Sequence, residues 1–351
     1  MSLTAALAIL GAVVLLALLL HGWWKTRRAG PRQAEPALPA AQRVEPALGD
    51  AAQAHGAQAA APQAGEAAPR RAPGARPPAR LDALIDAIVP LSLEAPVSGE
   101  LVLSQWPATR RAGTKPFHIE GLNLDSGEWE QPAAGQRYGE LQAGVQLANR
   151  SGALNEIEYS EFVQKLQTFA EGVGAMADFP DMLQVVARAR ELDALAGPLD
   201  AQLAVRLVAR SVAWSVGYVL QCAGRHGLLL GAVPGRLVLP ALDEGAPPQL
   251  VLEFDAQAAL ADEAQAAPLR EVILSLDVPQ TEAALDPFPS WHRIAHALAE
   301  DMDAVLLDDA GRPITLQAFD AIGKDLAKLY QTLESHDLAA GSAAARRLFA
   351  G

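Results

Sequence analysis

An uninterrupted apolar run near the N-terminus constrains this chain more than any other feature of its sequence. No charged residue occurs from Leu3 to Leu20. As a helix rising about 1.5 Å per residue, this run would span roughly 27 Å, close to the hydrocarbon thickness of a bilayer. The sequence therefore predicts that residues 1–28 form one transmembrane anchor with a basic flank. The residues that mark this anchor are Leu3, Leu20, Trp23, Trp24, Lys25, Arg27 and Arg28.

The order of these residues predicts an orientation. Indole side chains favour the headgroup zone, and a cationic cluster beside a membrane helix stays on the cytoplasmic side. Here the basic residues follow the apolar run, so we expect a single-pass inner-membrane protein with a periplasmic N-terminus and a cytoplasmic remainder. A cleaved signal peptide is the alternative, but it needs basic residues before the run and small residues after it. Met1 and Ser2 carry no positive side chain and two tryptophans follow, so the uncleaved anchor is favoured.

Residues 29–80 have the composition of a disordered linker. Ala, Pro, Gln, Gly and Arg dominate, and no aromatic residue occurs, so the segment lacks the apolar surface needed to offset its conformational entropy. As a flexible coil of about fifty residues it would reach on the order of 40 Å. Residues 1–80 carry nine basic and four acidic side chains, a net charge of +5. Because the whole chain has a net charge of −13, residues 81–351 carry −18. That acidic balance argues against non-specific binding of nucleic acid.

Signals of ordered structure begin at Leu81. Residues 85–93 and 202–208 read as buried strands, and the segments 250–254 and 271–278 alternate apolar and polar side chains as half-buried strands do. Apolar residues recur at helical spacing in three further segments, which are 159–173, 287–302 and 315–333. Interspersed helices and alternating strands predict an α+β fold, with an antiparallel sheet covered by helices on one face.

A short internal similarity hints at two tandem related units. Leu81-Asp82-Ala83, a strand, and then Val97-Ser98-Gly99-Glu100-Leu101 recur as Leu199-Asp200-Ala201, a strand, and Ser215-Val216-Gly217-Tyr218-Val219. The match is gapped, so chance resemblance stays open. The predicted organisation is a divergent α+β unit at 81–199, a second α+β domain at 200–338 and a flexible tail at 339–351.

Residues with catalytic or metal-binding chemistry form no convincing constellation. His292 and His296 have the spacing of helical metal ligands, but Arg293 stands where a zinc-protease helix needs Glu, so a packed pair is favoured over a metal site. Cys222 lies in an apolar stretch and reads as packed. Asp308 and Asp309 read as a polar turn. We therefore expect a protein that is not an enzyme and has no cofactor and no metal.

The C-terminal part of the chain resembles a known family. The segments that carry the resemblance are 202–208, 217–220, 248–254, 272–279, 288–302 and Ala304-Val305-Leu306-Leu307-Asp308-Asp309 before Thr315. Together they are similar to the C-terminal domain of ZipA, the bacterial cell-division protein that tethers FtsZ to the inner membrane. The order of anchor, basic patch, Pro-rich linker and α+β domain is also that of ZipA-like proteins. Residues 81–199 resemble the family less.

The resemblance implies where a partner would bind. In that family a six-stranded antiparallel sheet has helices on one face, and its other face takes the short C-terminal tail of FtsZ in a shallow apolar groove. Glu253 and Asp277 also fall on that face and, like Ser275, depart from the larger apolar groups that the family favours. The positions carried over as partner-binding residues are Val233, Val238, Val251, Ile273 and Ser275.

Three functions follow for testing. The first is a non-enzymatic adaptor that acts in septation, with FtsZ and inner-membrane lipid as partners and with no nucleic acid or small-molecule substrate. The second is a single-pass membrane scaffold for a different cytoplasmic partner. The third is a membrane-tethered sensor or enzyme, which would need a concave pocket with perturbed titratable groups.

Overall fold

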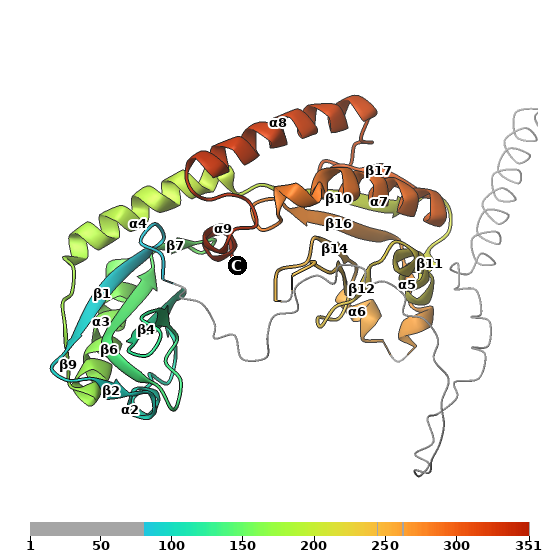
Figure 1. The fold of residues 1–351 in the computed structure, drawn as a ribbon. Helices are drawn as coiled ribbons and strands as arrows, with labels where there is room; N and C mark the ends of the chain where they lie inside the picture. The colour runs from blue at the N-terminus through green and yellow to red at the C-terminus, as the bar shows by residue number, and fades with distance from the viewer. Residues whose placement is uncertain (1–80, 244, 262, 351) are drawn as a thin grey trace, which may run out of the picture. The chain divides into compact units, whose positions relative to one another are not determined.

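The computed structural model describes residues 81–243, 245–261 and 263–350, which form two compact units. We call residues 81–147 with 154–189 the first unit, and residues 148–153 with 190–350 the second unit. Each unit combines an antiparallel sheet with helices, so the α+β prediction is confirmed (Figure 1). The predicted anchor and linker, residues 1–80, lie outside the described residues.

The first unit is built around a seven-stranded sheet in the order β3-β4-β6-β1-β9, with β2 paired to β6 and β5 paired to β4. Its helix α3 (Glu156–Val173) begins with a capping box in which Asn155 and Glu158 bond each other's backbone. The predicted apolar stripe of this helix is buried against the sheet, and Phe162 meets Phe117 edge to face with ring centroids 5.4 Å apart. The remaining elements are β1 (Asp86–Leu93), β2 (Val97–Ser98), α2 (Gly99–Ser104), β3 (Arg111–Ala112), β4 (Lys115–Asn123), β5 (Trp129–Glu130), β6 (Arg137–Gln146), β9 (Ala175–Ala177) and α4 (Met182–Ala196), which continues into the second unit.

The second unit holds a six-stranded sheet in the order β12-β13-β14-β16-β10-β17, in which every pairing is antiparallel. Its strands are β10 (Gln202–Ala209), β12 (Leu229–Leu230), β13 (Arg236–Leu239), β14 (Leu250–Glu253), β16 (Glu271–Asp277) and β17 (Ala304–Leu307). Its larger helices are α5 (Val216–Arg225), α7 (Pro287–Met302) and α8 (Leu316–Ser335). Smaller elements are the paired strands β7 (Ala148–Asn149) and β8 (Gly152–Ala153), the pair β11 (Trp214–Ser215) and β15 (Pro268–Leu269), and the helices α6 (Ala256–Ala259) and α9 (Ala343–Leu348).

One face of this second sheet forms the core of its unit. Val205, Leu207, Leu252 and Leu274 alternate along three strands and are fully buried with apolar residues of α5, α7 and α8. Trp291 of α7 is also buried, and its indole N–H donates to the Leu274 carbonyl at 3.0 Å. Because side chains alternate along a strand, the residues between these core positions lie on the opposite face.

The two units share a topology. In each, the first strand lies between the last two strands of its sheet, so β6-β1-β9 corresponds to β16-β10-β17. A short helix follows in each, and its N-cap serine, Ser98 or Ser215, accepts from the backbone N–H three residues later. A long helix then ends on a left-handed residue, Gly174 at φ 70° or Asp303 at φ 53°, directly before the last strand. The short sequence similarity thus falls on equivalent positions.

Two predicted boundaries differ from the structure. The division expected between residues 199 and 200 lies instead at Arg190, within α4, and residues 148–153 group with the second unit. The tail expected to be flexible contains α9, which Ser342 caps and in which Ala345 and Leu348 are buried together with Phe349 beyond it. Burial of these apolar side chains orders the segment, a contribution that its Ala-rich sequence does not reveal.

Candidate functional site

The sheet face opposite the helices of the second unit carries a row of small and aliphatic side chains. Strand pairing places Leu229, Val238, Val251, Ser275 and Ala204 side by side across β12, β13, β14, β16 and β10. Leu229 is 58% exposed, and the other four are partly exposed. With strands about 4.8 Å apart, the row extends roughly 19 Å across the sheet. We call these five residues the aliphatic row.

A second row runs beside it. Arg236, Glu253, Ile273, Arg206 and Leu307 are paired across β13, β14, β16, β10 and β17. Of the five residues carried over from the family, Val238, Val251 and Ser275 therefore lie in one row and Ile273 in the next. Val233 does not belong to a strand: it lies in the turn between β12 and β13 and is 54% exposed.

The polar residues that depart from the family pattern are satisfied within the unit. The Ser275 hydroxyl donates to the Val251 carbonyl at 3.3 Å, and Arg236 Nε donates to Glu253 Oε1 at 2.8 Å. Asp277 accepts from the Arg150 guanidinium at 2.6 and 3.0 Å. Each group thus has an internal partner. A ligand that covers the face would therefore leave fewer polar atoms without a hydrogen bond than the number of polar residues in the sequence suggests.

Paired charges border the aliphatic row at both sides. Arg150, from the turn between β7 and β8, donates to Asp200 at 2.6 and 2.9 Å as well as to Asp277, so two carboxylates hold its guanidinium group. Burial works to lower the pKa of Arg150, but the hydrogen bonds to the two carboxylates hold the pKa above its ordinary value. On the other side, the hydrogen bond from Arg206 lowers the pKa of Glu271. The aliphatic row therefore has ion pairs on both of its sides.

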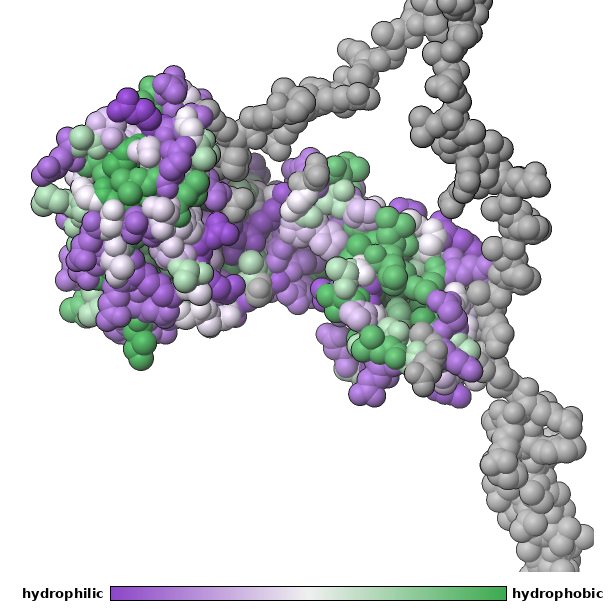
Figure 2. Space-filling model, turned by 90° about the horizontal axis from the view of Figure 1, so that it is seen from below, coloured by the Kyte–Doolittle hydropathy of each residue, from purple (hydrophilic) through white to green (hydrophobic). Residues whose placement is uncertain are grey.

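Further exposed aliphatic residues lie around β12 and α6. Figure 2, which views the molecule from below, shows an apolar area on the second unit. The exposed aliphatic residues of the second unit are Leu229, Leu230, Val233, Leu242 and Leu260. The first unit also exposes large apolar side chains, among them Leu103, Ile157 and Leu183, so it is strand pairing into one row that distinguishes the sheet face of the second unit.

The corresponding face of the first unit has a different character. Across β1, β6 and β4 it presents polar pairs, among them Asp86 opposite Gln146 and Glu120 opposite Gln142. The chain itself covers this face: the Leu81 N–H donates to Glu120 Oε1 at 3.0 Å. A Cβ on Gly144 would lie 2.6 Å from Leu81 Cδ2, so the Leu81 side chain rests on the middle strand.

The other residues with candidate chemistry also have definite places. Cys222 is buried on α5, as predicted. Asp308 accepts from the Arg312 N–H at 2.7 Å and holds the polar turn that the sequence predicts. His292 and His296 lie together on α7; burial lowers the pKa of His292, His296 lowers it further, and nearby Asp320 raises it. Within residues 81–350 as described, no group of three or more His, Cys, Asp or Glu side chains could hold a metal.

A search of the described part of the chain finds no helix with the length and apolar character needed to cross a membrane. The residues of the predicted anchor, from Leu3 to Arg28, lie outside that part.

Comparison with known proteins does not identify a family. No family model matches the chain, and no curated protein matches it. Among solved structures, the chain is weakly similar to berberine bridge enzyme from Eschscholzia californica in a monoclinic crystal form, at 9% identity and a TM-score of 0.17. That similarity covers 74% of this chain and 55% of the enzyme, so the chain spans about half of the enzyme's length.

Proposed function

We propose that this protein is a membrane-anchored adaptor of cell division that binds the C-terminal tail of FtsZ on the open sheet face of its second unit. The observation that carries the proposal is the aliphatic row, which crosses the sheet from Leu229 to Ala204. The anchor, the linker and the resemblance to ZipA in the sequence support the location and the partner. Under this proposal the protein acts by binding alone, and its soluble part stays in the cytoplasm beneath the inner membrane.

The dimensions of the row suit a short peptide. A helix advances 5.4 Å per turn, so a helix of about three to four turns laid across the strands would follow the whole row. Aliphatic side chains on one side of such a helix would meet Leu229, Val238 and Val251 in turn. Desolvated apolar anchors of this kind contribute about 1 to 3 kcal/mol each, so three of them account for a specific but moderate affinity.

Internal pairing of the polar residues supports the same face. Glu253 is bonded to Arg236 and Asp277 to Arg150, so a peptide seated on the row need not neutralise either carboxylate. These charged borders instead favour a ligand that has polar residues on both sides of its aliphatic anchors. The shortest way to test the assignment is to place a charge in the centre of the row.

Binding of a fluorescent peptide with the sequence of the FtsZ tail to the full-length protein in detergent micelles provides that test. We expect saturable binding to the wild type and at least tenfold weaker binding to Val251→Asp, because the carboxylate would be desolvated under the peptide. The matched control is Ile157→Asp, which replaces an 81% exposed aliphatic residue at the start of α3 in the first unit. It should bind as the wild type does.

The outcomes separate the partner from the face. If the wild type does not bind the peptide, FtsZ is not the partner. If Val251→Asp and Ile157→Asp bind equally well, the peptide lies elsewhere. Val251→Thr keeps the shape of the side chain, so a smaller loss in that variant guards against a folding defect in Val251→Asp.

A second candidate is a scaffold for a different cytoplasmic partner. It is favoured by Ser275, Glu253 and Asp277, which make this face more polar than the groove that the resemblance implies. If this candidate is right, wild-type protein should capture a partner other than FtsZ, and Val251→Asp should fail to capture it.

The predicted anchor is tested separately. Removal of residues 1–28 should release the protein from membranes and leave peptide binding unchanged.

A further inference from the structure

Two half-buried imidazole rings lie together where α7 meets α8. His292 and His296 are one helical turn apart, so they point to the same side of α7. Their ring centroids are 4.6 Å apart, with the rings edge to face. Phe319 of α8 packs against both, with centroid distances of 4.1 Å to His292 and 5.5 Å to His296. The contact with Phe319 limits the rotation of both rings.

A ring nitrogen of each histidine lacks a hydrogen bond. The Nε2 atoms of His292 and His296 are buried and have no hydrogen-bond partner among the described residues. Proteins seldom leave buried polar atoms unsatisfied, and an unsatisfied pair is commonly resolved by a bound water or ion. A single ligand that accepts a lone pair from each of the two nitrogens would satisfy both.

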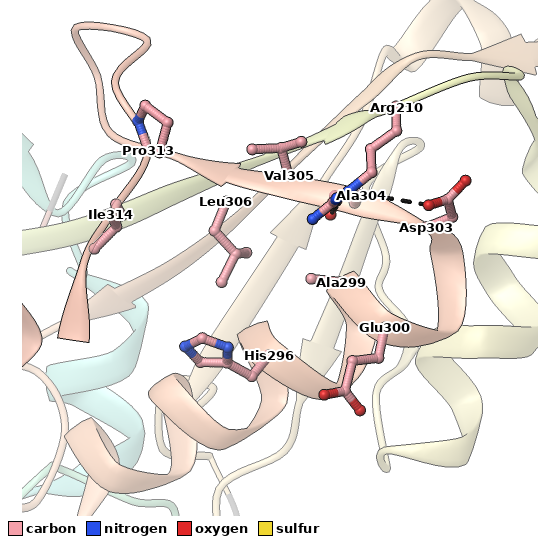
Figure 3. Close-up of a pocket in the computed structure, with 10 residues that line it drawn as sticks. All are labelled: Arg210, His296, Ala299, Glu300, Asp303, Ala304, Val305, Leu306, Pro313 and Ile314. Atoms are coloured by element: carbon pink, nitrogen blue, oxygen red, sulfur yellow. Dashed lines mark hydrogen bonds and ion pairs between the residues drawn. The ribbon is translucent and has the colours of Figure 1, made fainter.

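A pocket adjoins His296, one member of the pair. This pocket of about 450 Å³ lies between α7 and the strand β17. In Figure 3 the His296 ring rises from α7 toward Leu306 and Ile314, while the Glu300 carboxylate points away from it. Because a liquid water occupies about 30 Å³, this pocket can hold several waters beside the imidazole.

We propose that His292 and His296 bind one divalent transition-metal ion of the class that prefers nitrogen ligands, such as Zn²⁺. Imidazoles four residues apart on a helix are suited to chelate such an ion. Water would complete its coordination, because the described residues contain no larger cluster of His, Cys, Asp or Glu that could hold a metal. Such a site is weaker than a closed structural zinc site, which has four protein ligands.

This inference depends on the structure and not on the spacing alone. The sequence favours a packed pair, since Arg293 replaces the glutamate of a zinc-protease helix. That substitution argues against proteolysis and leaves the two nitrogen ligands unaffected. The orphaned Nε2 atoms and the adjoining pocket add the two observations that a packed pair does not explain.

The test is titration of Zn²⁺ into full-length protein that was first treated with a chelator, followed by calorimetry and thermal unfolding. We expect a saturable site and a higher melting temperature with Zn²⁺, because the ion binds the folded state. His292→Gln and His296→Gln should each weaken binding at least tenfold and abolish the shift. The matched control is His336→Gln, which alters an exposed histidine at the end of α8 and should behave as the wild type.

Two results would overturn the proposal: absence of saturable Zn²⁺ binding to the wild type, or unchanged binding in the variant that carries both His292→Gln and His296→Gln. Unfolding of each variant without metal shows whether it is folded. If a variant is not folded, nitrogen-15 spectra of the wild type decide instead. Zn²⁺ must then shift the Nε2 resonances of two histidines, and unshifted resonances would reject the site.

Discussion

The two units use one topology and treat the second face of the sheet in opposite ways. In the second unit Val238, Val251 and Ile273 stay partly exposed on that face. In the first unit Glu120 on the corresponding face is 2% exposed and accepts a hydrogen bond from the chain segment that begins at Leu81. The helix-covered face fixes the fold in both units, which leaves the other face free to differ. We therefore expect partner binding in the second unit alone.

The largest predicted effect on stability compares the same local feature, the start of the short helix, in the two units. Each has a glycine at the start of its short helix. A Cβ on Gly99 would lie 1.8 Å from the Ala133 carbonyl oxygen, and a Cβ on Gly217 would lie 2.7 Å from Gln265 Oε1. Because backbone cannot move aside as a side chain can, we expect Gly99→Ala to cost about 3 kcal/mol or more and Gly217→Ala about 1 kcal/mol. Chemical denaturation measures both, and equal costs would contradict the stated contacts.

The next effect concerns the N-terminal cap of α3. Burial works to raise the pKa of Glu158, but hydrogen bonds from Thr114 and Asn155, together with Lys115, hold the pKa below its ordinary value of 4.5. A carboxylate with a lowered pKa stabilises the folded state above pH 4.5 and loses that contribution as the pH falls through and below this value. Glu158→Gln should cost about 1 to 2 kcal/mol at pH 7 and reduce the acid sensitivity of the first unit.

Denaturation of both proteins at pH 7 and at pH 3 checks this. The difference in stability between wild type and Glu158→Gln should shrink at the lower pH. A difference that stays constant would show that the ionised carboxylate does not stabilise the cap.

The third prediction concerns a substitution that makes the open sheet face of the second unit more apolar. Glu253 lies beside the aliphatic row and pairs with Arg236 at the surface. Under the proposed function, Glu253→Leu adds an apolar anchor and should tighten binding of the FtsZ tail peptide about tenfold. Fluorescence anisotropy with the full-length protein measures the change. Weaker binding would show that the carboxylate itself contacts the peptide.

The smallest effect lies at the ends of the long helices. Gly174 adopts φ 70° with open space around the position of a Cβ, whereas its counterpart Asp303 adopts φ 53°. Gly174→Ala should cost about 1 kcal/mol, because an L side chain is strained in the left-handed region. Asp303→Gly should change the stability by less, since relief of strain offsets the loss of the hydrogen bond with Ser211. A larger cost for Asp303→Gly would show that its side chain matters more than its backbone.

The elements that the sequence predicts well are those with a clear period. The strands β1, β10, β14 and β16 and the helices α3, α7 and α8 lie within a few residues of their predicted bounds, and Thr315 caps α8 as expected. Periodicity succeeds there because one face of each element packs in a core.

Other elements escape prediction because polar residues are buried in them. Strand β4 contains Lys115, Glu120 and Asn123, whose polar side chains are buried, and this interrupts the apolar–polar alternation that would mark the strand. Of the candidate site, strand parity locates Val238, Val251, Ile273 and Ser275 on one face, but it fails for Val233, which lies in a turn. The internal partners of Glu253 and Asp277 depend on pairing in three dimensions that no local pattern reveals.

The open sheet face of the second unit is the proposed binding site of the partner. Amide hydrogen exchange of the full-length protein, with and without the FtsZ tail peptide, locates that site strand by strand. We expect the peptide to slow exchange in β13, β14 and β16 and to leave exchange in β1, β4 and β6 unchanged. Protection in the strands of the first unit, with none in β13, β14 and β16, would contradict the proposed site.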